Sequence, residues 1–290
     1  MKNQNSDFQR SLSRKLDFFR RLFKSPSAKL GGLLAIILIL SCIFAPYIAP
    51  YDPYKMNLKE IYKGPSLRHL FGTDAMGRDI FSRMLYGGRY SLTLAFMADV
   101  IGRGFGCIVG CIAGYFGKTT ETIIMRLCDI WSALPGTLLA ILISASLGSG
   151  FVNTMLALAI GGVPSNIRLT RGQIVAERGK EYLEAAESIN CSRFSIMFGH
   201  LLPNVISPTI VSITMGFGQT LTRAASLSYL GLGVQPPTPE WGAILSEGTN
   251  LVQTHPYLMF FPGLVIALTV FAMNLVGDGL RDALDPKLRD

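Results

Sequence analysis

Charged residues inside apolar stretches are the first candidates for chemistry in this sequence, because burying a charge in an apolar interior is costly. Asp99 and Arg103 lie four residues apart in such a stretch, which places both side chains on one face of a helix. Arg223 lies in another apolar stretch, which contains no acidic residue. The sequence therefore predicts that Asp99, Arg103 and Arg223 are candidates for lining a polar pathway.

Each of these candidates also has a plainer explanation. Asp99 and Arg103 could neutralise each other as a structural ion pair, and the same holds for Arg126 and Asp129, three residues apart. For Arg223, three explanations stay open: it lines a pathway, it reaches the outer membrane interface, or it pairs with an acid of a partner subunit.

A polar segment at 171–203 interrupts the apolar pattern and is too polar to enter a bilayer. Residues 176–189 within it fit an amphipathic helix, and Asn190 stands where a left-handed residue would end that helix. The apolar face of this helix would carry Tyr182, Leu183, Ala186 and Ile189. Such a helix is suited to docking in a groove of a soluble partner. A helix lying on lipid is the weaker alternative, because basic residues do not dominate its polar face.

The residue types that an active site or a metal site requires are scattered along the chain. His69, His200 and His255 fall in different loops, and the five cysteines include no C-x-x-C pair. The run Gly117-Lys118-Thr119 lacks the upstream glycine of a phosphate-binding loop. The sequence therefore predicts no catalytic residue, no metal ligand and no cofactor bound by this chain.

The elements that would position the charged candidates are apolar stretches of membrane-spanning length. The chain has 49% apolar and only 16% charged residues, which argues against an ordinary soluble domain. A helix needs about 20 apolar residues to cross about 30 Å of hydrocarbon. We identify such stretches at about 30–49, 90–116, 122–147, 151–167, 204–230 and 258–280. We therefore predict an all-α polytopic membrane protein with six transmembrane helices.

Two local patterns refine this prediction. Pro135 and Gly136 predict a kink in the third stretch. Small residues recur every four positions in the second stretch, at Ala98, Gly102, Gly106, Gly110 and Gly114. This stripe predicts that the backbone of another helix packs closely against the second stretch.

The basic residues orient the chain. Eight lysines and arginines precede the first apolar stretch, whereas residues 231–257 contain none, so the positive-inside rule predicts that both termini are cytoplasmic. Basic residues on the cytoplasmic side account for the net charge of +8. The predicted partner of these residues is therefore the lipid bilayer and not a nucleic acid.

The predicted divisions are a cytoplasmic tail at 1–29, the first transmembrane helix at 30–50, a folded external segment at 51–88, a core of five transmembrane helices at 89–280 that includes the segment 171–203, and a cytoplasmic tail at 281–290. Phe18 and Phe23 of the first tail fit either a helix on the lipid surface or a disordered tail.

The polar segment also carries a recognisable signature. Glu184-Ala185-Ala186 is followed at the seventh position by Asn190 and then by Leu202-Pro203, which resembles the EAA motif of ABC importer permeases. The family usually has glycine at the position of Asn190, and isoleucine, or histidine in its peptide-transporter branch, at the position of His200. Asparagine adopts the left-handed conformation most readily after glycine, so the turn should be preserved.

Further motifs narrow this resemblance. They read F-G-T-D at 71–74, G-R-D-I at 77–80, L-S-Y-L-G-L-G at 227–233, Q-P-P-T-P-E-W-G at 235–242 and N-L-V-G-D-G-L-R-D-A-L-D-P at 274–286. Together, from about residue 28 to the end, they look like the C-type permease subunit of dipeptide, oligopeptide, glutathione and nickel importers.

The resemblance implies a type I ABC importer permease fold in a bacterial inner membrane, with a cytoplasmic coupling helix. It implies a heterodimer with a second homologous permease, two cytosolic ATPases that use ATP and Mg, and a periplasmic or extracellular substrate-binding protein. The residues it assigns to ATPase coupling are Tyr182, Leu183, Glu184, Ala185, Ala186, Ile189, Asn190 and Pro203. The expected cargo is a di- or oligopeptide or a related peptide such as glutathione. Nickel or a metal chelate stays open as another cargo, and an ion-coupled secondary transporter as another class.

Overall fold

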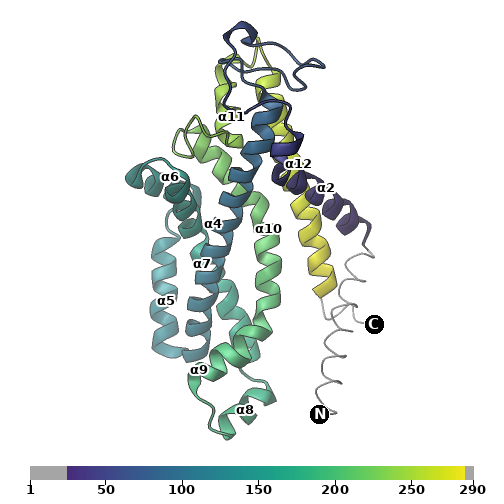
Figure 1. Ribbon diagram of the computed structural model, residues 1–290. Coiled ribbons are helices and arrows are strands. Elements are labelled where there is room, and N and C mark those ends of the chain that lie inside the picture. The colour runs from purple at the N-terminus through teal and green to yellow at the C-terminus, as the bar shows by residue number, and fades with distance from the viewer. Residues whose placement is uncertain (1–24, 285–290) are drawn as a thin grey trace.

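The computed structural model describes residues 25–284, and every regular element among them is a helix (Figure 1). The elements are α2 (Pro26–Ile43), α3 (Ala45–Ile48), a short turn (Leu58–Glu60), α4 (Ile80–Phe116), α5 (Lys118–Trp131), α6 (Gly136–Leu147), α7 (Phe151–Glu177), α8 (Glu181–Ser188), α9 (Arg193–Ser195), a π-helical stretch (Ile196–Leu201), α10 (Leu202–Tyr229), α11 (Trp241–Glu247), a second short turn (Thr249–Leu251) and α12 (Tyr257–Leu284). The lipid-surface helix considered for Phe18 to Phe23 lies outside the described residues.

Helices occupy all six stretches that the sequence marks as apolar. In the described part of the chain, length and composition identify four spans, at Pro26–Ile43, Ile80–Phe116, Arg193–Tyr229 and Tyr257–Leu284, and a bent pair of helices makes a fifth. The remaining helix, α7, has 27 residues but is less apolar, because Asn153, Asn166 and Arg168 lie along it. The predicted all-α membrane fold is confirmed, although length and composition alone do not reach the predicted six spans.

The third predicted stretch is corrected from one kinked helix to two helices. The axes of α5 and α6 differ by 78° across the break that ends at Pro135. Pro135 is the N-cap residue of α6, where its fixed φ of about −65° suits the start of a helix. The predicted kink is therefore correctly placed, but the turn there ends one helix and begins another.

The helix that carries Asp99 and Arg103 begins about ten residues earlier than the apolar pattern indicates. Asp79 caps α4, and its Oδ2 accepts a hydrogen bond from the backbone N–H of Ser82 at 2.7 Å. Residues 80–88, which the sequence analysis assigns to the external segment, are thus the first turns of α4.

The small-residue stripe of α4 packs against α7, as predicted. A Cβ added at Gly106 would lie 2.6 Å from the Cβ of Asn166, and one added at Gly110 would lie 2.7 Å from the carbonyl oxygen of Ile167. The two helices run in the same direction, because Gly102 meets Ala159 whereas Gly114 meets Ile174. Side chains larger than hydrogen have no space along this contact.

Replacing Gly106 by leucine is expected to lower the free energy of unfolding by roughly 1–3 kcal/mol, because overpacking forces α4 and α7 apart. Gly104 on the same helix is the matched control, since a Cβ there meets nothing within 4 Å. Gly104→Leu should leave the stability nearly unchanged or raise it slightly, because leucine favours helix over glycine. Thermal unfolding of both purified variants in detergent checks this prediction, and equal unfolding temperatures would contradict it.

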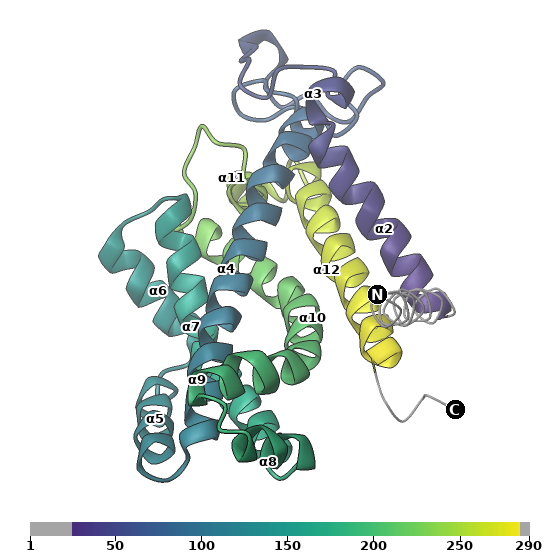
Figure 2. The same cartoon turned by 60° about the horizontal axis from the view of Figure 1, so that its bottom comes forward.

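The two ends of the helix bundle carry different structures. Figures 1 and 2 show the segment between α3 and α4 together with α11 towards the top, and α8 with α9 at the bottom. α2 packs along α12 at one edge of the bundle in both views, where a side chain at Gly31 would collide with the α12 backbone at Ala272. The polar segment and the segment before α4 therefore lie at opposite ends.

Candidate functional site

The short helix α8 lies in the predicted EAA segment and ends in a defined turn. Asn190 has a φ of 60°, as the sequence predicts. The N–H of Asn190 donates to the Glu187 carbonyl at 2.9 Å, and the N–H of Cys191 donates to the Ala186 carbonyl at 3.1 Å. These two bonds form a Schellman motif, and Cys191 packs on the same apolar cluster as Ala186. Asn190, which stands where the EAA motif usually has glycine, therefore leaves the turn intact.

The predicted continuous helix at 176–189 is wrong. Ala176 and Glu177 form the end of α7, and residues 178–180 make a turn before α8 begins at Glu181. Gly179 lies in this turn, and glycine is among the weakest helix formers. The break lets α8 fold back beneath the bundle instead of extending α7.

One face of α8 is buried against the chain's own helices. Leu183 is 3% exposed and Ala186 is 5% exposed, and both pack with Cys111 of α4 and Ile174 of α7. The sequence groups these two residues with Tyr182 and Ile189 on an apolar face suited to a partner groove. In the structure only Leu183 and Ala186 are fully buried. They pack α8 against the bundle and are therefore not accessible to a partner.

The opposite face of α8 and its flanks are open to solvent. The exposed members of the predicted coupling set are Glu184, Ala185, Ile189, Asn190 and Pro203. Ile189 is 77% exposed. Tyr182 is half-buried and donates a hydrogen bond to Glu177 at 2.9 Å. Burial raises the pKa of Tyr182, and the hydrogen bond and charge of Glu177 also raise it, so this hydroxyl stays protonated at neutral pH.

A polar cavity of about 290 Å³ lies among α4, α7 and α10, with the start of α6 beside it. All three predicted pathway residues line it: Asp99 and Arg103 from α4, and Arg223 from α10. The structure therefore brings together the three charges that the sequence places in two separate stretches.

Arg103 is the most highly connected of the three. Its Nε donates to Oδ1 of Asp99 at 2.8 Å, and its Nη1 donates to Asn166 of α7 at 3.2 Å and also to Ser212 of α10. Gly216 makes room for this side chain, because a Cβ at Gly216 would overlap the guanidinium. Asp99 also accepts from Thr220 at 3.1 Å. The predicted Asp99–Arg103 pair exists, and it joins three helices.

Arg223 has no such connection. Within residues 25–284, no carboxylate lies within 4.0 Å of its guanidinium and no hydrogen bond is formed by it. Arg126, by comparison, lies 3.8 Å from Asp129 at the surface, and Asp129 has a closer partner in Arg168 at 3.0 Å.

Sequence reasoning missed the neutral residues around Arg103. Thr220 lines the cavity, and Ser212 and Gly216 contact the Arg103 side chain. With Arg223 they recur at spacings of four, four and three residues, which places them on one face of α10. Polar or small residues at helical spacing in an apolar stretch were the signal that could have found them. Asn166 of α7 carried no comparable signal.

A second charged cluster lies at the far end of the bundle from α8. Arg83 is fully buried and donates to Asp74 at 2.5 Å and to Glu247 at 2.6 and 2.8 Å. Arg78 donates to the same two carboxylates. Glu240 caps α11 and accepts from Ser91 of α4 at 2.8 Å. These contacts fix α11 and the segment before α4 to the first turns of α4.

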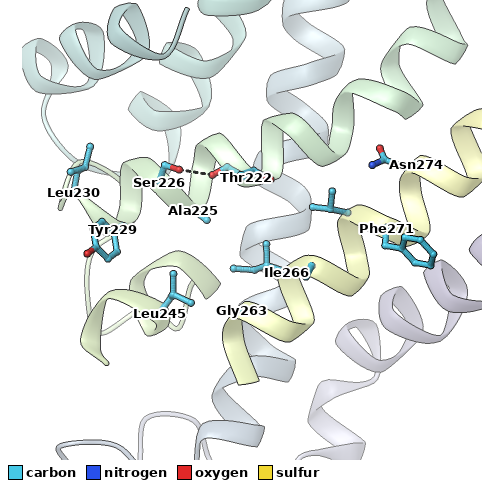
Figure 3. Close-up of a pocket in the computed structure, with 12 residues that line it drawn as sticks. Thr222, Ala225, Ser226, Tyr229, Leu230, Leu245, Gly263, Ile266, Phe271 and Asn274 are labelled. Atoms are coloured by element: carbon cyan, nitrogen blue, oxygen red, sulfur yellow. Dashed lines mark hydrogen bonds between the residues drawn. The ribbon is translucent and has the colours of Figure 1, made fainter. Parts of the chain in front are cut away.

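An apolar groove of about 740 Å³ opens on the other face of α10, between α10, α11 and α12 (Figure 3). Tyr229 and Leu245 lie near one end, and Phe271 and Asn274 lie near the other. No charged side chain is among its lining residues. This groove therefore cannot compensate a charged group, and the polar cavity is the better candidate for contact with a solute.

Comparison with known proteins adds independent findings. Residues 106–290 match the family model of the binding-protein-dependent transport system inner membrane component, and residues 13–65 match the N-terminal transmembrane domain of oligopeptide transport permease C. The chain is 43% identical over 274 residues to the glutathione transport system permease protein GsiD of Pectobacterium atrosepticum, covering 94% of this chain and 91% of that protein. It is 46% identical to GsiD of Shigella sonnei, with 94% and 90% covered.

Among solved structures, a similar fold is found in the inward-facing MetNI methionine ABC transporter. The TM-score is 0.57 at 16% sequence identity, with 70% of this chain and 97% of that chain covered. At this identity the likeness concerns the fold alone.

Proposed function

The chain belongs to the family of binding-protein-dependent transport system inner membrane components, and from this premise we propose that it imports glutathione or another small peptide, driven by ATP hydrolysis. As an ABC importer permease, it is a transport component and not an enzyme, because ATP hydrolysis belongs to partner ATPases. The cargo is the part of the proposal that rests on the relatives, whose names specify glutathione transport.

The observation that carries the proposal is the structure of α8. Its buried face, with Leu183 and Ala186, holds the helix to α4 and α7, while Glu184, Ala185 and Ile189 stay exposed. A rigidly held helix with a free face can transmit the movement of a partner to the bundle. We therefore assign Glu184, Ala185, Ile189 and Asn190 to contact with an ATPase, and Leu183 and Ala186 to transmission of the movement.

The proposal extends to assembly and orientation. The family works with ATPases and a substrate-binding protein, and the finer expectation is a heterodimer with a second homologous permease. The end with α8 would face the cytoplasm, together with both termini, so the segment before α4 and α11 would face the binding protein. ATP and Mg would be bound by the ATPases, with no cofactor on this chain.

A competition experiment tests the cargo. The complete transporter takes up labelled glutathione into proteoliposomes in the presence of unlabelled glutathione, mixed dipeptides or nickel. Competition by glutathione or peptides is expected. Nickel is not favoured, because the relatives named above are glutathione permeases. Uptake that is blocked by nickel but indifferent to peptides would overturn the proposed cargo.

A further inference from the structure

We propose that the polar cavity among α4, α7 and α10 binds a carboxylate group of the transported substrate, with the Arg223 guanidinium as the group that contacts it. This inference rests on the proposed function, because it assumes that the cargo is a peptide with a free carboxylate.

The charges of the cavity favour an anion. Asp99 and Arg103 neutralise each other through a hydrogen-bonded pair, which leaves the positive charge of Arg223 without a partner in the described residues. A half-buried arginine without a carboxylate partner is stabilised when an anion approaches. Arginine also matches a carboxylate geometrically, because its planar fork can donate two parallel hydrogen bonds.

Asp99 forms no ion pair with Arg223 within 4.0 Å, although the Arg223 charge acts on it from a longer distance. Its Oδ1 already accepts from Arg103 and Thr220, and its Oδ2 is buried without a hydrogen-bond partner in the described residues. The Asp99 carboxylate is held in place through Arg103, which is bonded to Asn166 and Ser212. The charge of Arg223 therefore stays available to a ligand.

The size and lining of the cavity define what fits. At about 290 Å³ it lies at the lower limit of the 300–1,000 Å³ typical of small-molecule sites, so it suits the charged end of a peptide and not a whole one. Ser165, Gln219 and Thr220 add neutral hydrogen-bonding groups around Arg223. These groups can complete the coordination of a carboxylate without adding charge.

The cavity adjoins a second one of about 600 Å³ that reaches Arg281 near the end of α12. Arg103 and Gln219 line both cavities and form the wall between them. A substrate carboxylate held at Arg223 would therefore lie next to a route that leads towards the end of the bundle where α12 ends.

The test compares Arg223→Gln and Arg223→Lys with the matched control Arg126→Gln, an exposed arginine on α5. ATP-driven glutathione uptake by the complete transporter in proteoliposomes is expected to fall about 10- to 100-fold in Arg223→Gln, the range for a lost charged hydrogen bond. Arg223→Lys should retain part of the uptake, since it keeps the charge but cannot donate two parallel hydrogen bonds, and Arg126→Gln should behave like wild type. If Arg223 only filled space, its charge would not matter, and Arg223→Lys would transport no better than Arg223→Gln.

A binding measurement gives a second readout. Labelled glutathione is bound to the transporter in nanodiscs without the binding protein, and glutathione or its diethyl ester is added as competitor. We expect displacement by glutathione, no displacement by the ester, and loss of binding in Arg223→Gln. Equal binding by Arg223→Gln and wild type, or equal displacement by the ester, would overturn the inference. Loss of the second permease from purified Arg223→Gln would also overturn it, in favour of a salt bridge between subunits.

The uptake results distinguish a failure of the carboxylate site from a failure of the proposed function. If wild type takes up no peptide with ATP, the proposed function fails. If wild type takes up glutathione and Arg223→Gln does so at the same rate, only the carboxylate site fails.

Discussion

Combining Glu184→Lys with Ile189→Asp is expected to abolish co-purification of the ATPases while the permease still folds and inserts. Both side chains are exposed, and Ile189 is 77% exposed, so neither change disturbs the packing of Leu183 and Ala186. A charge reversal and the burial of a new carboxylate would each cost about 2 kcal/mol or more at the centre of an interface. Together they would weaken binding by roughly a thousandfold, and ATP-driven uptake would be lost with it.

The comparison variant for this experiment is Ala186→Trp. Ala186 is 5% exposed and packs within the chain's own cluster, so a tryptophan there would displace α8 and lower the thermal stability of the permease. The exposed pair should leave the unfolding temperature unchanged. Retained binding of the ATPases by the Glu184→Lys, Ile189→Asp variant would reject α8 as the coupling surface.

Replacing Arg83 by methionine is expected to give the largest loss of stability. Arg83 is 1% exposed at its side chain and lies between Asp74 and Glu247. Its removal would leave two carboxylates crowded together with only Arg78 to compensate them. Breaking a buried ion pair from one side costs about 3–5 kcal/mol. For a chain of this size that corresponds to an unfolding temperature about 6–20 °C lower, measured at one fixed scan rate in detergent.

Arg68 supplies the matched control for Arg83. Its pair with Glu60 has the arginine side chain 77% exposed, so Arg68→Met should cost no more than about 1 kcal/mol. If Arg83→Met and Arg68→Met lowered the unfolding temperature equally, the buried cluster would not be what fixes α11 to α4.

Features that depend on local sequence were predictable. The left-handed Asn190, the position of the bend at Pro135 and the packing stripe that includes Gly106 each follow from a backbone preference or a periodic pattern. The helices were also predictable from the apolar stretches. These are long enough to cross a bilayer, where the backbone must form its hydrogen bonds within a helix.

Features that depend on contacts between distant segments were not predictable. Glu247 pairs with Arg83 across 164 positions, and Ser212 meets Arg103 across 109, so no spacing rule connects them. The sequence also did not indicate where the apolar face of α8 packs. An amphipathic helix can bury that face against its own chain or a partner, and only the position of Cys111 and Ile174 decides.

The most direct test of the account is the dependence of uptake on ATP. Labelled glutathione is supplied with the binding protein to proteoliposomes that contain the complete transporter, with ATP or a non-hydrolysable analogue on the side of α8. Accumulation above the outside concentration is expected with ATP, and none is expected with the analogue. Accumulation at the same rate with either nucleotide would contradict the claim that ATPases move this permease through α8.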